Sequence, residues 1–215
     1  MPQVNLDRQT VVRAALRLLD KAGLDGLTVR KLAADLGVRA PALYWHFKNK
    51  EELLDEMATA VFIDAVRDPA WPGPDTSWPA WAEQVGKRIR EMLLRYRDGA
   101  RIFSGRYLTD PSLYGMMESS LRKLTEAGLS LRDATQGLNT IYCYAIGFAI
   151  EEQAVYPRPG RRQKRYELAE RTKRVDSKKF PLAAAAGEHT FADFDKHFEQ
   201  GLRIIIKGFS SGQRR

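Results

Sequence analysis

The sequence predicts an all-α protein, and three observations carry that prediction. Apolar residues recur at every third or fourth position along most of the chain, as they do in helices that bury one face. Residues that cap or break helices stand at the ends of these segments. No segment alternates apolar and polar residues in the manner of a half-buried strand. We therefore expect helices joined by turns throughout.

Four helices are predicted in quick succession at the start of the chain. Asp7 suits the N-cap of the first, and Gly23 ends it. The sequence "NKEE" from Asn49 to Glu52 has the form of a capping box and should open the fourth. The second, third and fourth helices are expected over about residues 28–37, 39–47 and 50–66.

A proline-rich break, "RDPAWPGPDTSWP" at residues 67–79, separates these helices from the rest of the chain. Helical spacing resumes beyond it, and Thr190 to Asp193 resembles a capping box with Asp in place of Glu. The helices expected in this part span residues 78–96, 111–127, 131–153 and 190–209.

The segment from Arg158 to Lys179 differs from its surroundings, because it holds ten Lys and Arg residues against three Asp and Glu. Such a block is usually a solvated loop, here with one short helix near residues 166–174. A second contact with nucleic acid is the alternative interpretation.

Composition bounds the class of protein. A chain of 215 residues can form one large domain or two modest ones, and its net charge of +8 indicates an anionic partner. The single cysteine, Cys143, excludes an internal disulfide and a structural metal site built on cysteines. The N-terminus lacks the apolar core of a signal peptide, and the longest apolar run, residues 140–150, is too short to span a bilayer. These features predict a cytoplasmic protein without a membrane partner.

The stretch from Val29 to Leu43 has the spacing of a helix-turn-helix. Ala33 must be small because the next helix crosses over it, and Gly37 supplies the positive φ that ends the first helix of the pair. A helix-turn-helix presents the exposed face of its second helix to the major groove of DNA. The alternative is an ordinary helical hairpin with a solvated basic face.

Rings and cations gather on that exposed face. Tyr44 can contact thymine methyl groups, while Trp45 and His46 can donate to phosphates and Lys48 adds charge. This pattern favours DNA binding over a plain hairpin.

The segment "GLTVRKLAADLGVRAPALYWHFKNKEELLD" resembles the DNA-binding signature of the TetR family of bacterial transcriptional repressors, close to its tetracycline-repressor subgroup. "LLRYRDGARI" and "GLSLRDATQGLNTIYCYAIGFAIEEQ" extend the resemblance over most of residues 5–155. It implies a DNA-binding domain at residues 1–50, a ligand-binding and dimerisation domain at 51–215, and a connecting helix at 51–67. It also implies a homodimer, a palindromic double-stranded operator and a small-molecule inducer.

Carrying contacts over residue by residue gives a partial match. Arg30, Pro41 and Tyr44 match positions that touch bases in the subgroup, and Lys50 matches a phosphate contact. Ala40 replaces a base-reading glutamine and Arg39 replaces a glutamate, so the binding mode should carry over but the operator sequence should not. The predicted DNA-contacting residues are Thr28, Arg30, Arg39, Ala40, Pro41, Tyr44, Trp45, His46, Lys48 and Lys50.

Two helices carry apolar seams. Residues 131–148 place apolar side chains at alternating steps of three and four, and a seam that begins at Phe191 does nearly the same in the last helix. The resemblance implies a four-helix bundle across a twofold axis, and packing within one chain is the alternative. The predicted dimerisation residues are Leu131, Leu138, Ile141, Phe148, Phe194, Phe198, Leu202 and Ile205.

The resemblance also implies a ligand pocket, but most of its polar anchors are exchanged here. Phe103 stands where the subgroup has a histidine that helps hold the magnesium of the drug chelate, and a phenyl ring cannot ligate Mg²⁺. Glu151 is retained and could pair with Arg106. We expect a metal-free apolar or aromatic ligand. The predicted ligand-binding residues are Val66, Val85, Ile89, Phe103, Arg106, Tyr107, Ser120, Cys143 and Glu151.

The most consistent function is therefore a ligand-responsive repressor that acts as a homodimer. A DNA-binding regulator without an effector, or with an activator role, is the alternative. The three histidines lie far apart in the sequence, and no HExxH, GxSxG or phosphate-binding-loop pattern occurs, so we expect no enzyme, catalytic residue, metal or cofactor.

Overall fold

The structure is a computed structural model that describes residues 6–73, 75–190 and 192–212. Over these residues the chain is helical and contains no strand, which confirms the all-α prediction. The helices are α1 (Arg8–Ala22), α2 (Val29–Asp35), α3 (Ala40–Tyr44), α4 (Lys50–Arg67), α5 (Trp78–Leu94), α6 (Gly99–Phe103), α7 (Leu113–Glu126), α8 (Leu131–Val155), α9 (Leu168–Thr172), α10 (Pro181–Thr190) and α11 (Phe194–Gly212), with one short 3₁₀ turn at Lys164–Tyr166.

Side-chain caps fix where the N-terminal helices begin. Asp7 accepts a hydrogen bond from the amide of Thr10 at 2.7 Å, and Asn49 accepts one from the amide of Glu52 at 2.8 Å. The Glu52 carboxylate accepts a hydrogen bond from the amide of Lys48 at 2.7 Å. In a standard capping box the donor would be the amide of Asn49, one residue later.

The predicted helices α1 to α5, α7 and α8 are confirmed, and a short helix, α9, lies inside the basic segment. The sequence did not predict α6 or α10. Helix α6 has only five residues, and α10 has an alanine-rich sequence without an amphipathic period. The last helix begins at Phe194 rather than Thr190, because Thr190 ends α10. Phe191, the first residue of the predicted seam, lies outside the described residues.

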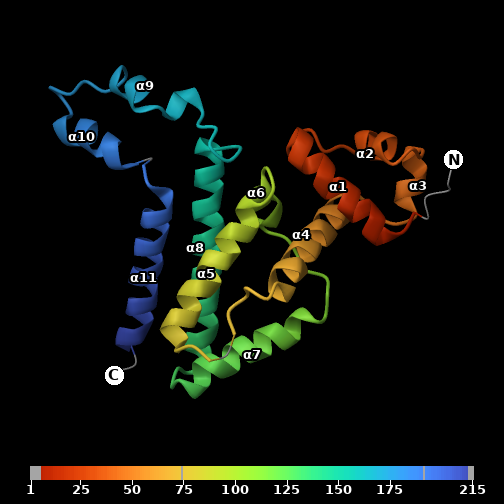
Figure 1. Cartoon of the computed structure of the whole chain (residues 1–215), viewed down its shortest axis with the longest axis horizontal. Coiled ribbons are helices and arrows are strands. Elements are labelled where there is room, and N and C mark those ends of the chain that lie inside the picture. The colour runs from red at the N-terminus through yellow and green to blue at the C-terminus, as the bar shows by residue number, and fades with distance from the viewer. Residues whose placement is uncertain (1–5, 74, 191, 213–215) are drawn as a thin grey trace.

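The helices form two packed groups joined by α4 (Figure 1). Helices α1 to α3 pack into a small unit, and α4 runs from it to the larger group, where α5, α8 and α11 pack against one another. Helix α5 approaches α11 closely, since a Cβ added at Gly86 would lie 2.7 Å from Leu202. Helices α9 and α10 project from the far end of α8 (Figure 1).

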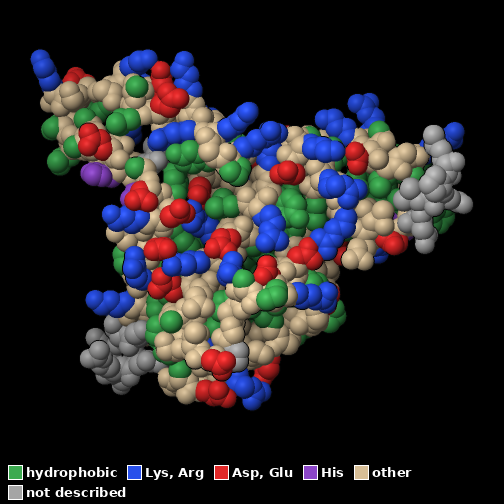
Figure 2. All heavy atoms as spheres, viewed as in Figure 1, with side chains coloured by type: hydrophobic (Ala, Val, Ile, Leu, Met, Phe, Trp, Pro, Cys, Tyr) green, Lys and Arg blue, Asp and Glu red, His purple; other side chains and the backbone are tan. Residues whose placement is uncertain are grey.

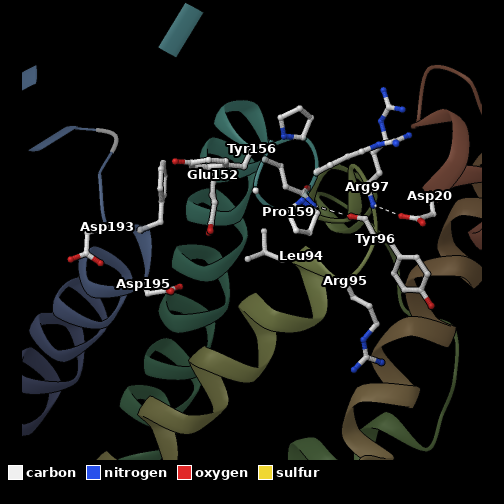
Figure 3. Close-up of a pocket in the computed structure, with 15 residues that line it drawn as sticks. Asp20, Leu94, Arg95, Tyr96, Arg97, Glu152, Tyr156, Pro159, Asp193 and Asp195 are labelled. Atoms are coloured by element: carbon white, nitrogen blue, oxygen red, sulfur yellow. Dashed lines mark hydrogen bonds between the residues drawn. The ribbon is translucent and has the colours of Figure 1, made fainter. Parts of the chain in front are cut away.

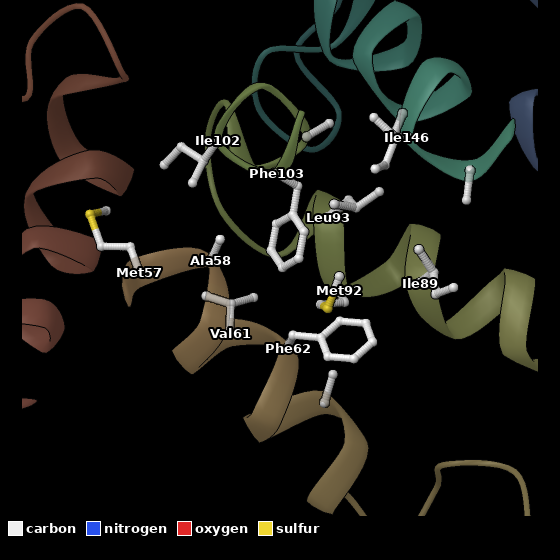
Figure 4. Packing of buried hydrophobic residues seen from close by; sticks show 14 of the residues in the cluster. Met57, Ala58, Val61, Phe62, Ile89, Met92, Leu93, Ile102, Phe103 and Ile146 are labelled. Carbon is white, nitrogen blue, oxygen red and sulfur yellow. The ribbon is translucent and has the colours of Figure 1, made fainter. Parts of the chain in front are cut away.

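Buried side chains join α4 to the larger group. Phe62 of α4 and Phe103 of α6 lie with their ring centroids 6.3 Å apart, beside Met92 of α5 (Figure 4). The buried amide of Gln153 ties α8 to the α5–α6 turn, because it donates to the carbonyls of Leu93 and Tyr96 and accepts from the amide of Ala100. The connecting helix therefore rests on a well-packed core.

Among the helices described, none is both long and apolar enough to cross a membrane.

Candidate nucleic-acid interface and ligand cavity

Helices α2 and α3 form the predicted helix-turn-helix. Gly37 adopts a φ of 67°, and the amide of Val38 donates to the carbonyl of Ala33 at 2.9 Å, which closes the turn. Ala33 and Leu43 are buried at the crossing of the two helices. The small residue and the glycine thus have the structural roles that their spacing predicts.

The face of the pair that points away from the core carries most of the predicted DNA-contacting side chains. Trp45 is 88% exposed and Tyr44 is 54% exposed, which is unusual for large rings with no partner. Thr28 accepts a hydrogen bond from the amide of Lys31 at 3.2 Å and so caps α2. The exposed members of the set are Thr28, Arg30, Arg39, Pro41, Tyr44, Trp45 and Lys48, and the half-buried members are Ala40, His46 and Lys50.

The cations on this face are not neutralised by the protein. Within the part of the chain that the structure describes, the side chains of Arg30, Lys31 and Arg39 form no ion pair. Unpaired guanidinium and ammonium groups beside exposed rings suit a surface that binds phosphates and base edges.

Helix α4 holds this unit firmly. Arg8 of α1 donates to the carbonyl of His46, pairs with Glu52 at 3.0 Å and with Glu56 at 2.8 Å, and lies 4.7 Å from the centroid of the Phe47 ring. Arg13 of α1 makes a two-pronged pair with Asp64 further along α4. A displacement of α4 must therefore carry the helix-turn-helix with it.

A cavity of about 1040 Å³ opens between α4, α5, α7 and α8. We call it the α5–α8 cavity. Most of the lining is aromatic or aliphatic, and α8 contributes four polar side chains beside its apolar ones. The lining residues are Phe62, Trp71, Trp81, Val85, Ile89, residues 107–111, Leu113, Tyr114, Met116, Met117, Ser120, Leu121, Leu131, Arg132, Thr135, Gln136, Leu138, Asn139, Ile141 and Tyr142.

The cavity contains only some of the predicted ligand-binding residues. Val85, Ile89, Tyr107 and Ser120 line it. The others lie elsewhere: Phe103 is buried beside the cavity against Phe62, Val66 is half-buried on α4, and Cys143 and Glu151 are exposed on the outer face of α8. Phe62 and Trp71 also line the cavity, but they are not among the ligand-binding residues predicted from the sequence. For Trp71 the one signal was the occurrence of a large ring inside the proline-rich break.

Arg106 does not pair with Glu151. Its guanidinium pairs instead with Glu51 and lies 3.5 Å from Asp55, both on α4. Three residues later, the amide of Thr109 donates to the hydroxyl of Thr59 on α4 at 2.9 Å. The α6–α7 loop, residues 104–112, therefore touches α4 at two places, and it also supplies residues 107–111 to the wall of the cavity.

A smaller, more polar hollow of about 420 Å³ lies where α1 meets the ends of α5 and α8 (Figure 3). Asp20 accepts a hydrogen bond from the amide of Arg97 at 3.3 Å, and Arg158 donates to the carbonyl of Lys21 at 3.4 Å. Asp98 accepts one from the amide of Leu24 at 2.9 Å. These bonds form a second contact between the N-terminal unit and the larger group.

The predicted dimerisation residues divide into two sets. Ile141, Phe198 and Leu202 are buried within their own chain, where Phe198 stacks on Tyr144 at 5.2 Å between ring centroids. Leu131 is 62% exposed, and the other four are half-buried; these are Leu138, Phe148, Phe194 and Ile205. At these three buried residues the two seams pack against each other within one chain. Packing within one chain was the alternative to a dimer interface.

Small and apolar residues remain exposed on the same two helices. Ile204 of α11 is 73% exposed, and a Cβ added at Gly147 or Gly208 would meet no atom within 4 Å. Cys143 of α8 is exposed as well.

Comparisons with known proteins match both the N-terminal and the C-terminal part of the chain. A family model described as "Bacterial regulatory proteins, tetR family" matches residues 11–57, and one described as "Tetracyclin repressor-like, C-terminal domain" matches residues 71–211. The chain is 40% identical to the tetracycline repressor protein class A from transposon 1721 of Escherichia coli, over 95% of this chain and 91% of that protein.

Solved structures show the same arrangement of helices. A possible TetR family transcriptional regulator from Streptomyces coelicolor A3(2) superposes with a TM-score of 0.83 at 35% identity, covering 95% of this chain and 99% of that one. The Streptomyces coelicolor TetR family protein ActR in complex with actinorhodin gives 0.81 at 29% identity, covering 99% and 100%.

Proposed function

The chain belongs to the TetR family of bacterial regulatory proteins, and from this premise we propose how it works as a ligand-responsive transcriptional repressor. Residues 1–50 bind a palindromic operator, and residues 51–215 bind the inducer and form a homodimer. Helix α4 joins the two functions. The proposal places the protein in the bacterial cytoplasm, beside its DNA, and gives it no catalytic role.

The DNA-binding part of the proposal is supported by the exposed face of α2 and α3. In this proposal Tyr44 and Arg39, both exposed, read base edges, while Trp45, Lys48 and Lys50 contact phosphates. Two such faces must lie one helical turn of DNA apart, roughly 34–36 Å, to fit a palindrome. A twofold dimer meets that requirement.

The observation that carries the regulatory part is the double role of the α6–α7 loop. Tyr107 and Thr109 line the α5–α8 cavity, and Thr109 and Arg106 are bonded to α4. A ligand that pushes on this loop also pushes on α4, which is bonded to the helix-turn-helix through Arg8 and Arg13. Ligand binding thereby favours a spacing of the recognition helices that no longer fits the operator.

The cavity fits an aromatic ligand that carries no metal. Mg²⁺ needs oxygen donors, and the position of the drug-chelating histidine holds the buried Phe103. No group of three or more His, Cys, Asp or Glu side chains suited to a metal occurs among the described residues. The phenyl ring of Phe103 does not fit a magnesium chelate, and the aromatic walls fit planar rings.

We place the dimer interface on the outer face of α8 and α11, around Cys143, Gly147, Ile204 and Gly208. Small residues allow helices to approach closely, and Ile204 lacks any other cover. Glu151, exposed on the same helix, would then lie near the partner subunit.

Footprinting of the DNA upstream of the gene, followed by release of that fragment in the presence of aromatic compounds, tests the proposal. A regulator without an effector would bind the fragment identically with every compound. A cavity of this size and apolarity favours the ligand-responsive function over that alternative.

A further inference from the structure

The α8 wall of the cavity differs chemically from the other walls. Trp81, Val85 and Ile89 of α5 and Phe62 of α4 present rings and aliphatic groups. Helix α8 presents apolar residues as well, but it adds four polar side chains, at Arg132, Thr135, Gln136 and Asn139. A ligand that fills the cavity can therefore meet polar groups along α8 that the α4 and α5 walls do not offer.

Two charged residues line the cavity within the described chain, and one of them is already engaged. Asp110 accepts a hydrogen bond from the amide of Ser112 at 2.8 Å. Hydrogen bonds from the Ser112 side chain and backbone, together with the nearby charge of Arg67, lower the pKa of Asp110, so it stays ionised and satisfied in place.

Arg132 is the other charged residue, and no ion pair or hydrogen bond involves its guanidinium in the described structure. Its neighbour Asp133 is bonded to Ser130 at 2.6 Å instead. A cation at the edge of an apolar cavity, without a carboxylate partner, is well suited to an anionic group on a bound molecule.

Uncharged donors stand beside Arg132 along α8. Burial raises the pKa of Tyr142, so its hydroxyl stays protonated and can donate, and no described group bonds to it. Gln136 is exposed to solvent and lines the cavity, and its side chain likewise has no hydrogen-bond partner in the described structure. Thr135 is less available, because its hydroxyl donates to the carbonyl of Leu131 at 2.8 Å.

We propose that the inducer is a planar aromatic molecule with an acidic substituent, a carboxylate or an ionised phenol, which Arg132 binds while Gln136, Asn139 and Tyr142 bind its carbonyl or hydroxyl groups. This inference rests on the proposed function, since it assigns the ligand class of the same cavity. It specifies that the ligand carries a negative charge and that this charge lies near Arg132. The other walls of the cavity select only for flat, apolar rings.

Two fluorescent dyes that differ in one group test the inference. 1-Anilinonaphthalene-8-sulfonate carries an anion, and N-phenyl-1-naphthylamine has the same rings without it. We expect Arg132→Gln to weaken binding of the anionic dye by about five- to tenfold, because it removes a charged hydrogen bond. Binding of the neutral dye should change by less than about twofold. Arg132→Lys should retain most of the affinity for the anionic dye.

Two control variants place the effect in the cavity. Arg122→Gln removes a cation of α7 that pairs with Glu118 at 3.0 Å outside the cavity, and it should affect neither dye. Ser120→Trp should fill the cavity and weaken both dyes. If both dyes bind the unmodified protein and Arg132→Gln weakens them equally or not at all, the inference is wrong while the proposed cavity stands. If neither dye binds the unmodified protein, the proposed ligand function fails as well.

Discussion

The amide of Thr109 donates a hydrogen bond to the hydroxyl of Thr59 at 2.9 Å, and this bond joins the wall of the ligand cavity to the helix that carries the DNA-binding unit. The two hydroxyls also lie 3.2 Å apart, and Thr59 donates to the carbonyl of Asp55 within α4. Thr59 is buried, so water cannot easily replace the bond.

Thr59→Val should uncouple ligand binding from DNA release. Valine keeps the shape of the side chain but leaves the amide of Thr109 without its acceptor, at a cost of about 1–3 kcal/mol. We expect near-normal DNA affinity and a weaker inducing effect of any cavity ligand, measured by fluorescence anisotropy of labelled operator. Thr140→Val, which removes a hydroxyl bonded only within α8, is the matched control. If a cavity ligand still releases DNA fully from Thr59→Val, this hydrogen bond does not couple ligand binding to DNA release.

Tyr44→Ala and Lys50→Ala should both weaken operator binding without unfolding the protein. We propose that Tyr44 contacts the bases, so its loss should reduce discrimination between sequences. We propose that Lys50 contacts a phosphate, so its loss should weaken binding to all sequences and lower the salt slope by about one. Binding at several salt concentrations separates the two effects, with Arg122→Gln of α7, outside the DNA-binding unit and the basic segment, as a control. Unchanged binding in both variants would contradict the assignment of α3 as the recognition helix.

Substitutions in α11 should distinguish the two sides of that helix. Phe198 is fully buried in its own chain, so Phe198→Glu should unfold or aggregate the protein. Ile204 is exposed, so Ile204→Glu should give a folded monomer if it lies in the dimer interface. Circular dichroism and sedimentation measure fold and mass on the same sample. A folded dimer of Ile204→Glu would place the interface elsewhere.

Arg90 should be important for stability, whereas one of its two partners should not. Arg90 is bonded to Glu152 at 2.6 and 2.7 Å and to Asp195 at 2.7 Å, and it lies over the rings of Phe148 and Phe198. Arg90→Met leaves the shielded Glu152 carboxylate unpaired and should cost about 3–5 kcal/mol of the free energy of unfolding. Asp195→Ala, at an exposed side chain, should cost under about 1 kcal/mol. Urea denaturation of both variants checks this contrast, and equal losses would refute it.

Tetracycline with Mg²⁺ should release little DNA, because Phe103 cannot ligate the metal and is packed against Phe62. Titration of the operator complex with the drug, with and without magnesium, measures the response. Release at micromolar drug would show that the cavity accepts the chelate.

The helix-turn-helix could be predicted from the sequence because local rules determine it. Gly37 and Ala33 have roles that depend on backbone geometry and on the size of a single side chain, and both are visible in the sequence. The first and fourth helices could be predicted for the same reason, since Asp7 and Asn49 form their caps within three residues.

The cavity could not be predicted in the same detail, because it depends on which face of a helix meets which neighbour. Tyr142 lines the cavity, whereas Cys143, one residue later, is exposed and does not line it. Arg106 bonds to α4 because the α6–α7 loop folds back over that helix, which no spacing in the sequence indicates. A heptad seam likewise predicts that a helix face is buried, but it does not show whether the same chain or a partner subunit buries it. Phe198, for example, is buried within its own chain.

Reciprocity gives the most direct test of the central claim that the α5–α8 cavity controls DNA binding. If ligand binding lowers operator affinity, operator binding must lower ligand affinity by the same factor. The measurement is the affinity of the neutral dye N-phenyl-1-naphthylamine with and without saturating operator fragment, since an uncharged dye avoids direct repulsion by DNA. A dye that acts as an inducer should bind at least about fivefold more weakly in the presence of operator. Equal affinity in both conditions, with the dye lost from Ser120→Trp, would show that the cavity binds molecules without controlling DNA.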